Sequence, residues 1–130
     1  LVRYAEQLGI SEAVKFHGFS SEIHKIMAES AIYVSSSDYE GISNSMLEAL
    51  AIGIPAVCTD CPVGGARMYI RDGENGYLIP VGDADVMADR MLALMEDKKL
   101  GESFSKESVK IREELTDDRI FGMWKALLVR

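Results

Sequence analysis

The sequence predicts an α/β fold with a parallel sheet of about four strands flanked by helices. Two observations indicate this fold. Short apolar segments rich in β-branched residues alternate with segments whose apolar residues recur at helical spacing. The connections between them are also short, as in sheets built from strand–helix–strand units. The four predicted strands are residues 14–16, 31–34, 54–59 and 77–79.

Length and charge narrow the class of protein. The 130 residues suit one domain, and the hydrophobic content of 48% and charged content of 27% are ordinary for a globular protein. A net charge of -7 argues against nucleic-acid binding and against a polybasic membrane surface. No apolar run is long enough to span a bilayer, and no signal peptide is expected in this sequence.

The first half of the chain is predicted to contain three helices. Residues 1–8 have helical spacing up to a stop at Gly9, and no N-cap precedes Leu1, so the chain is expected to begin inside a helix. Ser20 or Ser21 caps a second helix. The third follows the polar loop after residue 34 and ends at Gly53.

In the second half of the chain, turn and helix-cap residues predict the loops and helices. A Pro- and Gly-rich loop, residues 61–65, follows the third predicted strand, and a short helical piece runs through Met68. Asp83 is expected to cap a long helix, and residues 98–130 to form the C-terminal helices. Among these, one helix carries Leu100 to Ile111, and Thr116 caps the last.

Two carboxylates mark the candidate site. Glu40 and Glu48 bracket the start of the third helix, where residues 41–44 leave backbone N–H groups free. A helix N-terminus binds anions, whereas carboxylates repel them and bind hydroxyls instead. A ligand with both chemistries is a nucleotide sugar. Because the loops after parallel strands share one edge of a sheet, Glu40 is expected to lie near Gly64 and Gly65.

These residues resemble a known family. Glu40 and Glu48 form an E-x7-E spacing, followed by residues 49–55 (ALAIGIP), 59–65 (TDCPVGG) and 72–76 (DGENG). The pattern is similar to the C-terminal, nucleotide-sugar-binding half of a retaining GT-B glycosyltransferase of family 4, or group 1. That group includes bacterial polysaccharide and lipopolysaccharide sugar transferases. The resemblance covers residues 10–97 well and implies a Rossmann-like sheet within a GT-B fold.

The resemblance also implies roles for individual residues. Glu40, the catalytic candidate, would hold hydroxyls of the donor sugar, and Glu48 would accept hydrogen bonds from the ribose. Further donor-binding contacts would come from the amides of Gly41, Ile42 and Ser43 at the diphosphate, from His17, Gly18 and Phe19 near the base, and from Gly64 and Gly65. The donor would be a nucleoside-diphosphate sugar, taken as UDP-linked, and no cofactor or metal is expected.

The chain departs from the family pattern at two places. Met68 stands where relatives often carry a Glu after the Gly-Gly pair. The domain's first two strands, with a basic pair for the leaving diphosphate, and the domain for a glycan or glycolipid acceptor would precede Leu1. The isolated chain is therefore expected to be an inactive donor-binding part. The strand at 14–16 would then pair directly with that at 31–34 in sequential order, or a second chain would fill the gap as a homodimer.

Several residues near the candidate site allow more than one interpretation. Glu48 could complete a capping box with Ser45, and Glu40 could be a solvated loop carboxylate. Cys58 and Cys61 form a C-x-x-C that could bind metal or be redox-active, although Cys58 also suits a strand core. Gly64 and Gly65 could serve a turn alone.

The sequence also leaves open the roles of several surface residues and the class of function. His17 and Arg67 could contact ligand or solvent, and Phe121 and Trp124 could be core or cover a partner domain. A sugar-nucleotide epimerase, a phosphorylase or a non-catalytic nucleotide-binding module could share the architecture. A cytoplasmic location, at the inner face of the membrane, is expected for the transferase.

Overall fold

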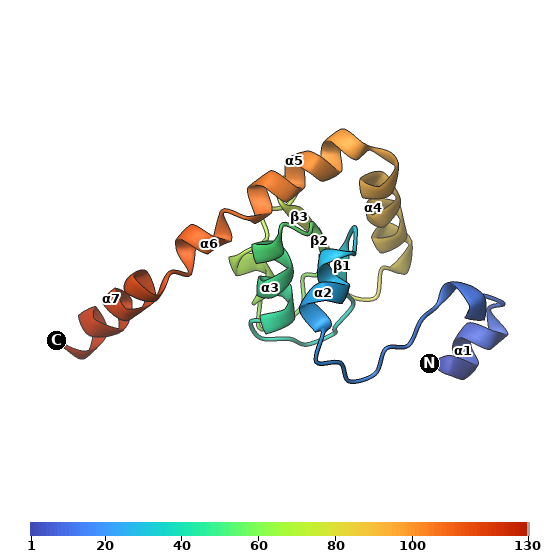
Figure 1. Cartoon of the computed structure of the whole chain (residues 1–130), viewed down its shortest axis with the longest axis horizontal. Coiled ribbons are helices and arrows are strands. Elements are labelled where there is room, and N and C mark those ends of the chain that lie inside the picture. Colours follow the sequence, from blue (N-terminus) through green and yellow to red (C-terminus); the bar gives the residue numbers. More distant parts are fainter. Residues whose placement is uncertain (130) are drawn as a thin grey trace.

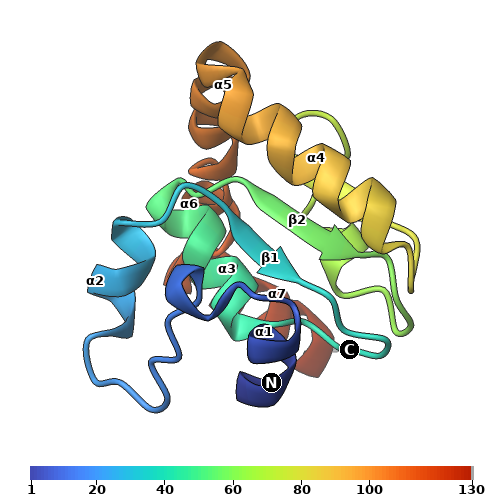
Figure 2. The ribbon, with the colours of Figure 1, turned by 90° about the vertical axis from the view of Figure 1, so that its right-hand side faces the viewer.

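The computed structural model describes residues 1–129, and within them it contains a three-stranded parallel sheet with helices on both faces (Figures 1 and 2). The strands are β1 (Tyr33–Ser35), β2 (Ala56–Thr59) and β3 (Gly76–Ile79), in the order β1-β2-β3. Val57 pairs with Val34 on one side and with Tyr77 on the other. The predicted α/β class and the parallel, sequential order of these three strands are confirmed.

The predicted strand at residues 14–16 does not form, so the expectation of about four strands is wrong. Residues 14–19 run without pairing after a 3-10 turn, η1 (Ser11–Ala13), and the first part of the chain leads away from the sheet (Figure 1). Phe16 is half exposed and Phe19 fully exposed. A strand needs a neighbour, and within residues 1–129 no strand pairs with this segment. Without ladder hydrogen bonds or buried area, nothing offsets the entropy of ordering it.

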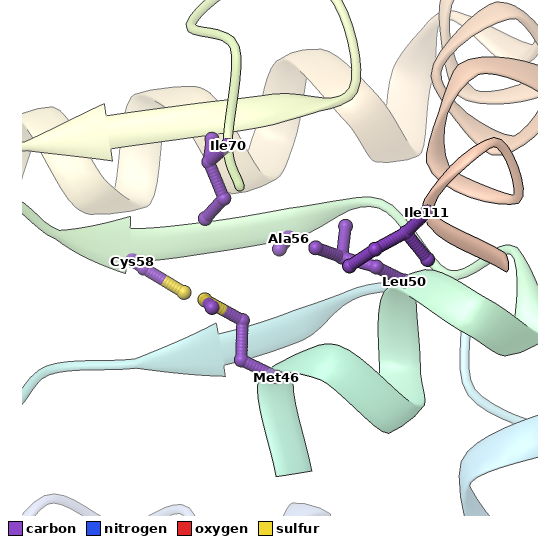
Figure 3. Close-up of a cluster of buried hydrophobic side chains, with 6 residues drawn as sticks. All are labelled: Met46, Leu50, Ala56, Cys58, Ile70 and Ile111. Carbon is purple, nitrogen blue, oxygen red and sulfur yellow. The ribbon is translucent and has the colours of Figure 1, made fainter. Parts of the chain in front are cut away.

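The central strand β2 is buried on both faces because its side chains alternate between two helical layers. Ala56 and Cys58 face α3 (Asn44–Ile52), and Val57 faces the opposite layer. Figure 3 shows the first cluster, in which the sulfur atoms of Cys58 and Met46 point toward one another. That cluster also contains Leu50, Ile70 and Ile111.

The opposite layer consists of α4 (Ala84–Glu96) and α5 (Lys98–Ser108), which lie together across the sheet (Figure 2). Leu94 and Phe104 pack there against Val57 and Ile79. The Phe104 ring lies 5.1 Å from that of Tyr77, centroid to centroid. This is the separation at which tilted aromatic pairs attract.

Local cap chemistry sets several helix ends as predicted, but neither Ser20 nor Ser21 caps α2 (Ile23–Ala28), whose N-cap is Glu22. Asp83 accepts from Val86 N–H at 3.0 Å to begin α4, and Thr116 from Arg119 N–H at 3.4 Å to begin α7 (Asp117–Leu128). Gly53 ends α3 with φ 97°, in the left-handed region that glycine favours. The single helix expected from Leu100 to Ile111 is instead two, α5 and α6 (Ile111–Glu114).

The remaining elements lie at the ends of the chain and at its loops. They are α1 (Val2–Gln7), followed by Gly9 at φ 69°, α2 (Ile23–Ala28) and the 3-10 turn η2 (Ala66–Met68). Helix α7 projects from the body (Figure 1), with Phe121 71% and Trp124 61% exposed, so these two are not core residues. Across residues 1–129, no helix combines the length and apolarity needed to cross a membrane.

Candidate functional site

The loop that carries Glu40 is fixed against the loop after β2. Glu40 N–H donates to the Pro62 carbonyl at 2.9 Å, and Val63 N–H donates back to the Glu40 carbonyl at 3.1 Å. The Thr59 hydroxyl also donates to the Ser37 carbonyl at 2.5 Å. The first two bonds form an isolated parallel bridge between Glu40 and Val63. The predicted convergence of the two loops at the carboxyl edge of the sheet is confirmed.

Glycine at position 65 is required by this convergence. A Cβ placed on Gly65 would lie 2.6 Å from the backbone nitrogen of Ile42, and closer still to the Gly41 carbonyl. Gly64 has φ 90°, which L side chains rarely adopt. The turn requirement considered from the sequence is therefore present at Gly64, whereas Gly65 allows close backbone approach.

The N-terminus of α3 presents free amides beside Glu40. Ser43 is the N-cap, and its hydroxyl accepts from Met46 N–H at 3.5 Å. Within residues 1–129, the amides of Gly41, Ile42 and Ser43 donate to no protein group. Gly41 and Ile42 are exposed. These N–H groups and the positive helix end form a surface suited to an anion.

Glu48 does not belong to a capping box. Because Ser43 caps the helix, the box position three residues later is Met46, and Ser45 instead bonds to the hydroxyls of Ser43 at 3.0 Å and Tyr33 at 2.8 Å. The Glu48 carboxylate faces α2, where its Oε2 lies 3.3 Å from Nε2 of His24. Its side chain is 44% exposed, so a ligand can reach it. The contact with His24 was not predicted from the sequence.

Glu40 is exposed and only weakly held. The Ser37 hydroxyl donates to its Oε2 at 3.4 Å, a long hydrogen bond. Behind the loop, Glu40, Gly41 and Ser43 border a hollow of only about 10 Å³, too small for a ligand. The side chain therefore faces an open surface, where it can accept hydroxyl groups of a ligand.

The segment His17, Gly18 and Phe19 is not brought to the Glu40 loop. His17 borders a separate open hollow of about 470 Å³ beside α2, together with Lys15, Ser20, Glu22, Lys25, Ile26 and Glu29. Phe19 is fully exposed and Gly18 has φ 61°. The site residues thus fall into two groups, one around Glu40 and one along α2, with Glu48 and His24 at the contact between α3 and α2.

Arg67 is not a free cation for a ligand. Its Nε and Nη2 bind the two carboxylate oxygens of Asp60 at 2.9 and 2.5 Å. Hydrogen bonding to Asp60, and then the charge of that carboxylate, raises the pKa of Arg67. The positive charge of Arg67 is therefore already balanced by Asp60.

The two cysteines are buried and free. Cys58 is a core residue of β2, as the strand interpretation predicted, and burial raises the pKa of its thiol to about 12. Thiols with a raised pKa are poor nucleophiles at neutral pH. Over residues 1–129, the structure has no cluster of three or more His, Cys, Asp or Glu side chains placed to hold a metal ion.

Another hollow lies away from these groups. It measures about 660 Å³ and borders Ala31 and Pro55, which precede β1 and β2, so it lies at the opposite end of the strands. Its other walls are the end of α3 and the α4–α5 corner, with Lys98, Glu102 and Lys106 at its border. We place the candidate site at the Glu40 edge, because parallel sheets bind ligands beyond their carboxyl ends.

Comparison with known proteins identifies what the chain is similar to. The family profile described as Glycosyl transferases group 1 matches residues 1–110. The chain is 37% identical over 128 residues to the putative glycosyltransferase EpsD of Bacillus subtilis, covering 95% of this chain and 33% of that protein. It is 34% identical over 100 residues to the lipopolysaccharide core biosynthesis glycosyltransferase LpsE of Rhizobium meliloti, covering 77% and 29%.

Solved structures share the fold. TarM of S. aureus, in a crystal structure with fondaparinux, α-GlcNAc-glycerol and UDP, aligns with a TM-score of 0.89 at 30% identity, over 97% of this chain and 26% of that one. Anabaena HepE in complex with UDP aligns with a TM-score of 0.86 at 24% identity, over 98% and 35%, a likeness of fold alone. The chain spans about a third of the length of the relatives EpsD and LpsE.

Proposed function

The chain belongs to the group 1 glycosyltransferases of GT-B fold, and on that premise we propose that it is the donor-binding part of an enzyme that transfers a sugar from a nucleoside diphosphate. The transfer retains the configuration at the anomeric carbon. The nucleotide is taken to be UDP, and the TarM structure, which contains UDP, supports this choice.

One observation carries the proposal. The amides of Gly41, Ile42 and Ser43 are free at the start of α3, between the carboxylates of Glu40 and Glu48. An anion flanked by hydroxyl-bearing groups satisfies all three features. In this arrangement the diphosphate meets the amides, the donor sugar meets Glu40, and the ribose meets Glu48. The close approach of Gly65 to Gly41 and Ile42 packs the loop after β2 against the loop that carries Glu40 and these amides.

The same geometry supports the proposal that this chain binds the donor, while other parts of a longer protein stabilise the departing diphosphate. The departing diphosphate gains negative charge, and stabilising such charge contributes about 3 kcal/mol per well-placed group. Arg67 is paired with Asp60, so it is not available for this task. We therefore expect cations from beyond this chain to complete the site, and the isolated chain to bind donor without turnover.

The names of the relatives suggest the class of acceptor. LpsE is a lipopolysaccharide core biosynthesis glycosyltransferase, and a further relative, 30% identical, is a poly(ribitol-phosphate) α-N-acetylglucosaminyltransferase. The proposed acceptor is accordingly a growing bacterial surface glycan, either a polysaccharide or a teichoic acid, held by a second domain. Such acceptors are commonly lipid-linked, which would place the enzyme at the cytoplasmic face of the membrane.

Calorimetric titration of the chain with UDP tests donor binding. We expect millimolar or tighter binding by the wild type, and weaker binding by Glu48→Ala and by Glu40→Ala tested with UDP-sugar. Glu96→Ala, an exposed carboxylate at the end of α4, is the matched control and should bind like the wild type. No heat of binding at millimolar UDP would contradict the proposal, and sugar transfer by the isolated chain would contradict the expectation that it binds donor without turnover.

A further inference from the structure

Glu48 has a partner that the proposed function does not use. Nε2 of His24, in the first turn of α2, lies 3.3 Å from Oε2 of Glu48, and the two side chains are 67% and 44% exposed. Their exposure leaves both accessible to a bound nucleotide. At this distance a protonated imidazole and a carboxylate form an ion pair.

The contact is set by buried packing, not by the pair itself. Met27, one helical turn after His24, is buried in a cluster with Ala49 and Ile54, and Ala49 directly follows Glu48. Side chains three residues apart share one face of a helix, so the face of α2 that packs on α3 also carries His24. The hydrophobic contact therefore fixes His24 beside Glu48 at a small entropic cost to the pair.

His24 engages only one of the two carboxylate oxygens. Within the part of the chain that the structure describes, Glu48 makes no hydrogen bond and no second ion pair. A carboxylate offers about four lone-pair sites, so capacity remains for two ligand hydroxyls. Contact with Oε2 restricts the rotamers of a long, half-exposed side chain, and such restriction before binding favours affinity.

We propose that His24 is a positioning residue that presets Glu48 to accept both hydroxyls of a ribose, and so contributes to the selection of ribonucleotides. The inference rests on the proposed function, which places the ribose at Glu48. It differs from the ordinary interpretation of an exposed ion pair, in which the contact contributes almost nothing and affects at most stability. Only positioning predicts an effect that depends on the hydroxyls of the ligand.

The test compares two probes, UDP and 2′,3′-dideoxy-UDP, by calorimetry on the full chain. Wild type should bind UDP more tightly than the dideoxy analogue. His24→Ala should weaken UDP binding about 3- to 10-fold, the effect of one net polar interaction, and leave the analogue's affinity unchanged. His24→Gln, which keeps an N–H donor, should restore part of the loss. In the Glu48→Ala background, His24→Ala should have no further effect on either probe.

A matched control removes a different exposed ion pair. Lys98 and Glu102 lie 3.8 Å apart on α5 and border the hollow at the opposite end of the strands from Glu40, so Lys98→Ala should bind both probes as the wild type does. Urea unfolding of each variant separates a loss of fold from a loss of positioning, because His24→Ala should keep the wild-type midpoint.

The possible results are distinguishable. Equal UDP affinity in wild type and His24→Ala overturns this inference and leaves the proposed function standing. Equal affinity of the wild type for the two probes also overturns it, since Glu48 would then not contact the ribose. No UDP binding by the wild type overturns the proposed function and this inference together.

Discussion

Replacing Gly65 by alanine tests how the two loops of the site are held together. Gly65 is buried, and the position of its Cβ would be 2.6 Å from the Ile42 nitrogen, with the Gly41 carbonyl closer still. Ordinary contact for a Cβ begins near 3.4 Å. The neighbours are backbone atoms and cannot rotate away, so the loops would have to separate by about an ångström or more.

The structure gives the magnitude of the effect. Separation breaks or weakens the two hydrogen bonds that join the loops, from Glu40 N–H to Pro62 and from Val63 N–H to Glu40. Each such bond contributes about 0.5–1.5 kcal/mol net. Gly65→Ala should therefore lower the free energy of unfolding by about 1–3 kcal/mol. It should also displace the loop that carries Glu40 and the free amides from Gly64 and Gly65.

Urea unfolding followed by circular dichroism measures the loss of stability, and titration with UDP-sugar measures the loss of the site. Gly41→Ala is the control, because a Cβ there meets no atom within 4 Å. We expect that variant to change stability by less than about 0.5 kcal/mol. If Gly65→Ala unfolds at the same urea concentration as Gly41→Ala, with a similar slope, the close approach of the loops is not what requires glycine.

Three further predictions concern the core, the thiol and the last helix. Leu50 is fully buried, so Leu50→Ala should lower the free energy of unfolding in urea by about 2–5 kcal/mol. Trp124 is exposed, so Trp124→Ala should change that free energy by less than about 0.5 kcal/mol. Equal effects of the two substitutions would contradict the core assignment. Burial raises the pKa of the Cys58 thiol from 9.0 to about 12, so the unfolded chain loses the thiol proton at a lower pH than the folded chain does. The free energy of unfolding should therefore fall as the pH rises between these two values, and it should fall less steeply in Cys58→Ala. The same dependence on pH in the variant and the wild type would refute this prediction. A Cβ added at Gly122, in α7, would meet no atom within 4 Å. Because alanine is favoured over glycine in helices by about 1 kcal/mol, Gly122→Ala should increase the helicity measured by circular dichroism. A loss of helicity would indicate a contact at Gly122.

Helix ends could be predicted because their causes are local. Asp83 and Thr116 cap helices with side chains that bond amides three residues on, and Gly53 adopts the conformation that ends a helix. The strand at residues 14–16 could not be judged in this way. Its alternation of side chains was correct for a strand, but a strand also needs a neighbour, and the sequence carries no local sign of one.

In the candidate site, too, some contacts could be predicted from the sequence and others could not. The approach of Glu40 to Gly65 follows from topology, because loops after neighbouring parallel strands meet at one edge. The contacts of Glu48 with His24 and of Arg67 with Asp60 depend on how α2 packs on α3 and on the shape of a Pro- and Gly-rich loop. Neither contact is encoded by spacing along the chain, so the sequence left open both a capping box at Glu48 and a ligand contact at Arg67.

The position of β2 at the centre of the molecule has a consequence for hydrogen exchange. Its residues pair with strands on both sides and are buried on both faces. Its amides can therefore meet solvent only when the whole sheet opens, and their exchange rate reports the global free energy of unfolding. The amides of α7, whose large apolar side chains are mostly exposed, report instead the fraying of a single helix. One exchange experiment would thus distinguish the cooperative unit from the elements attached to it.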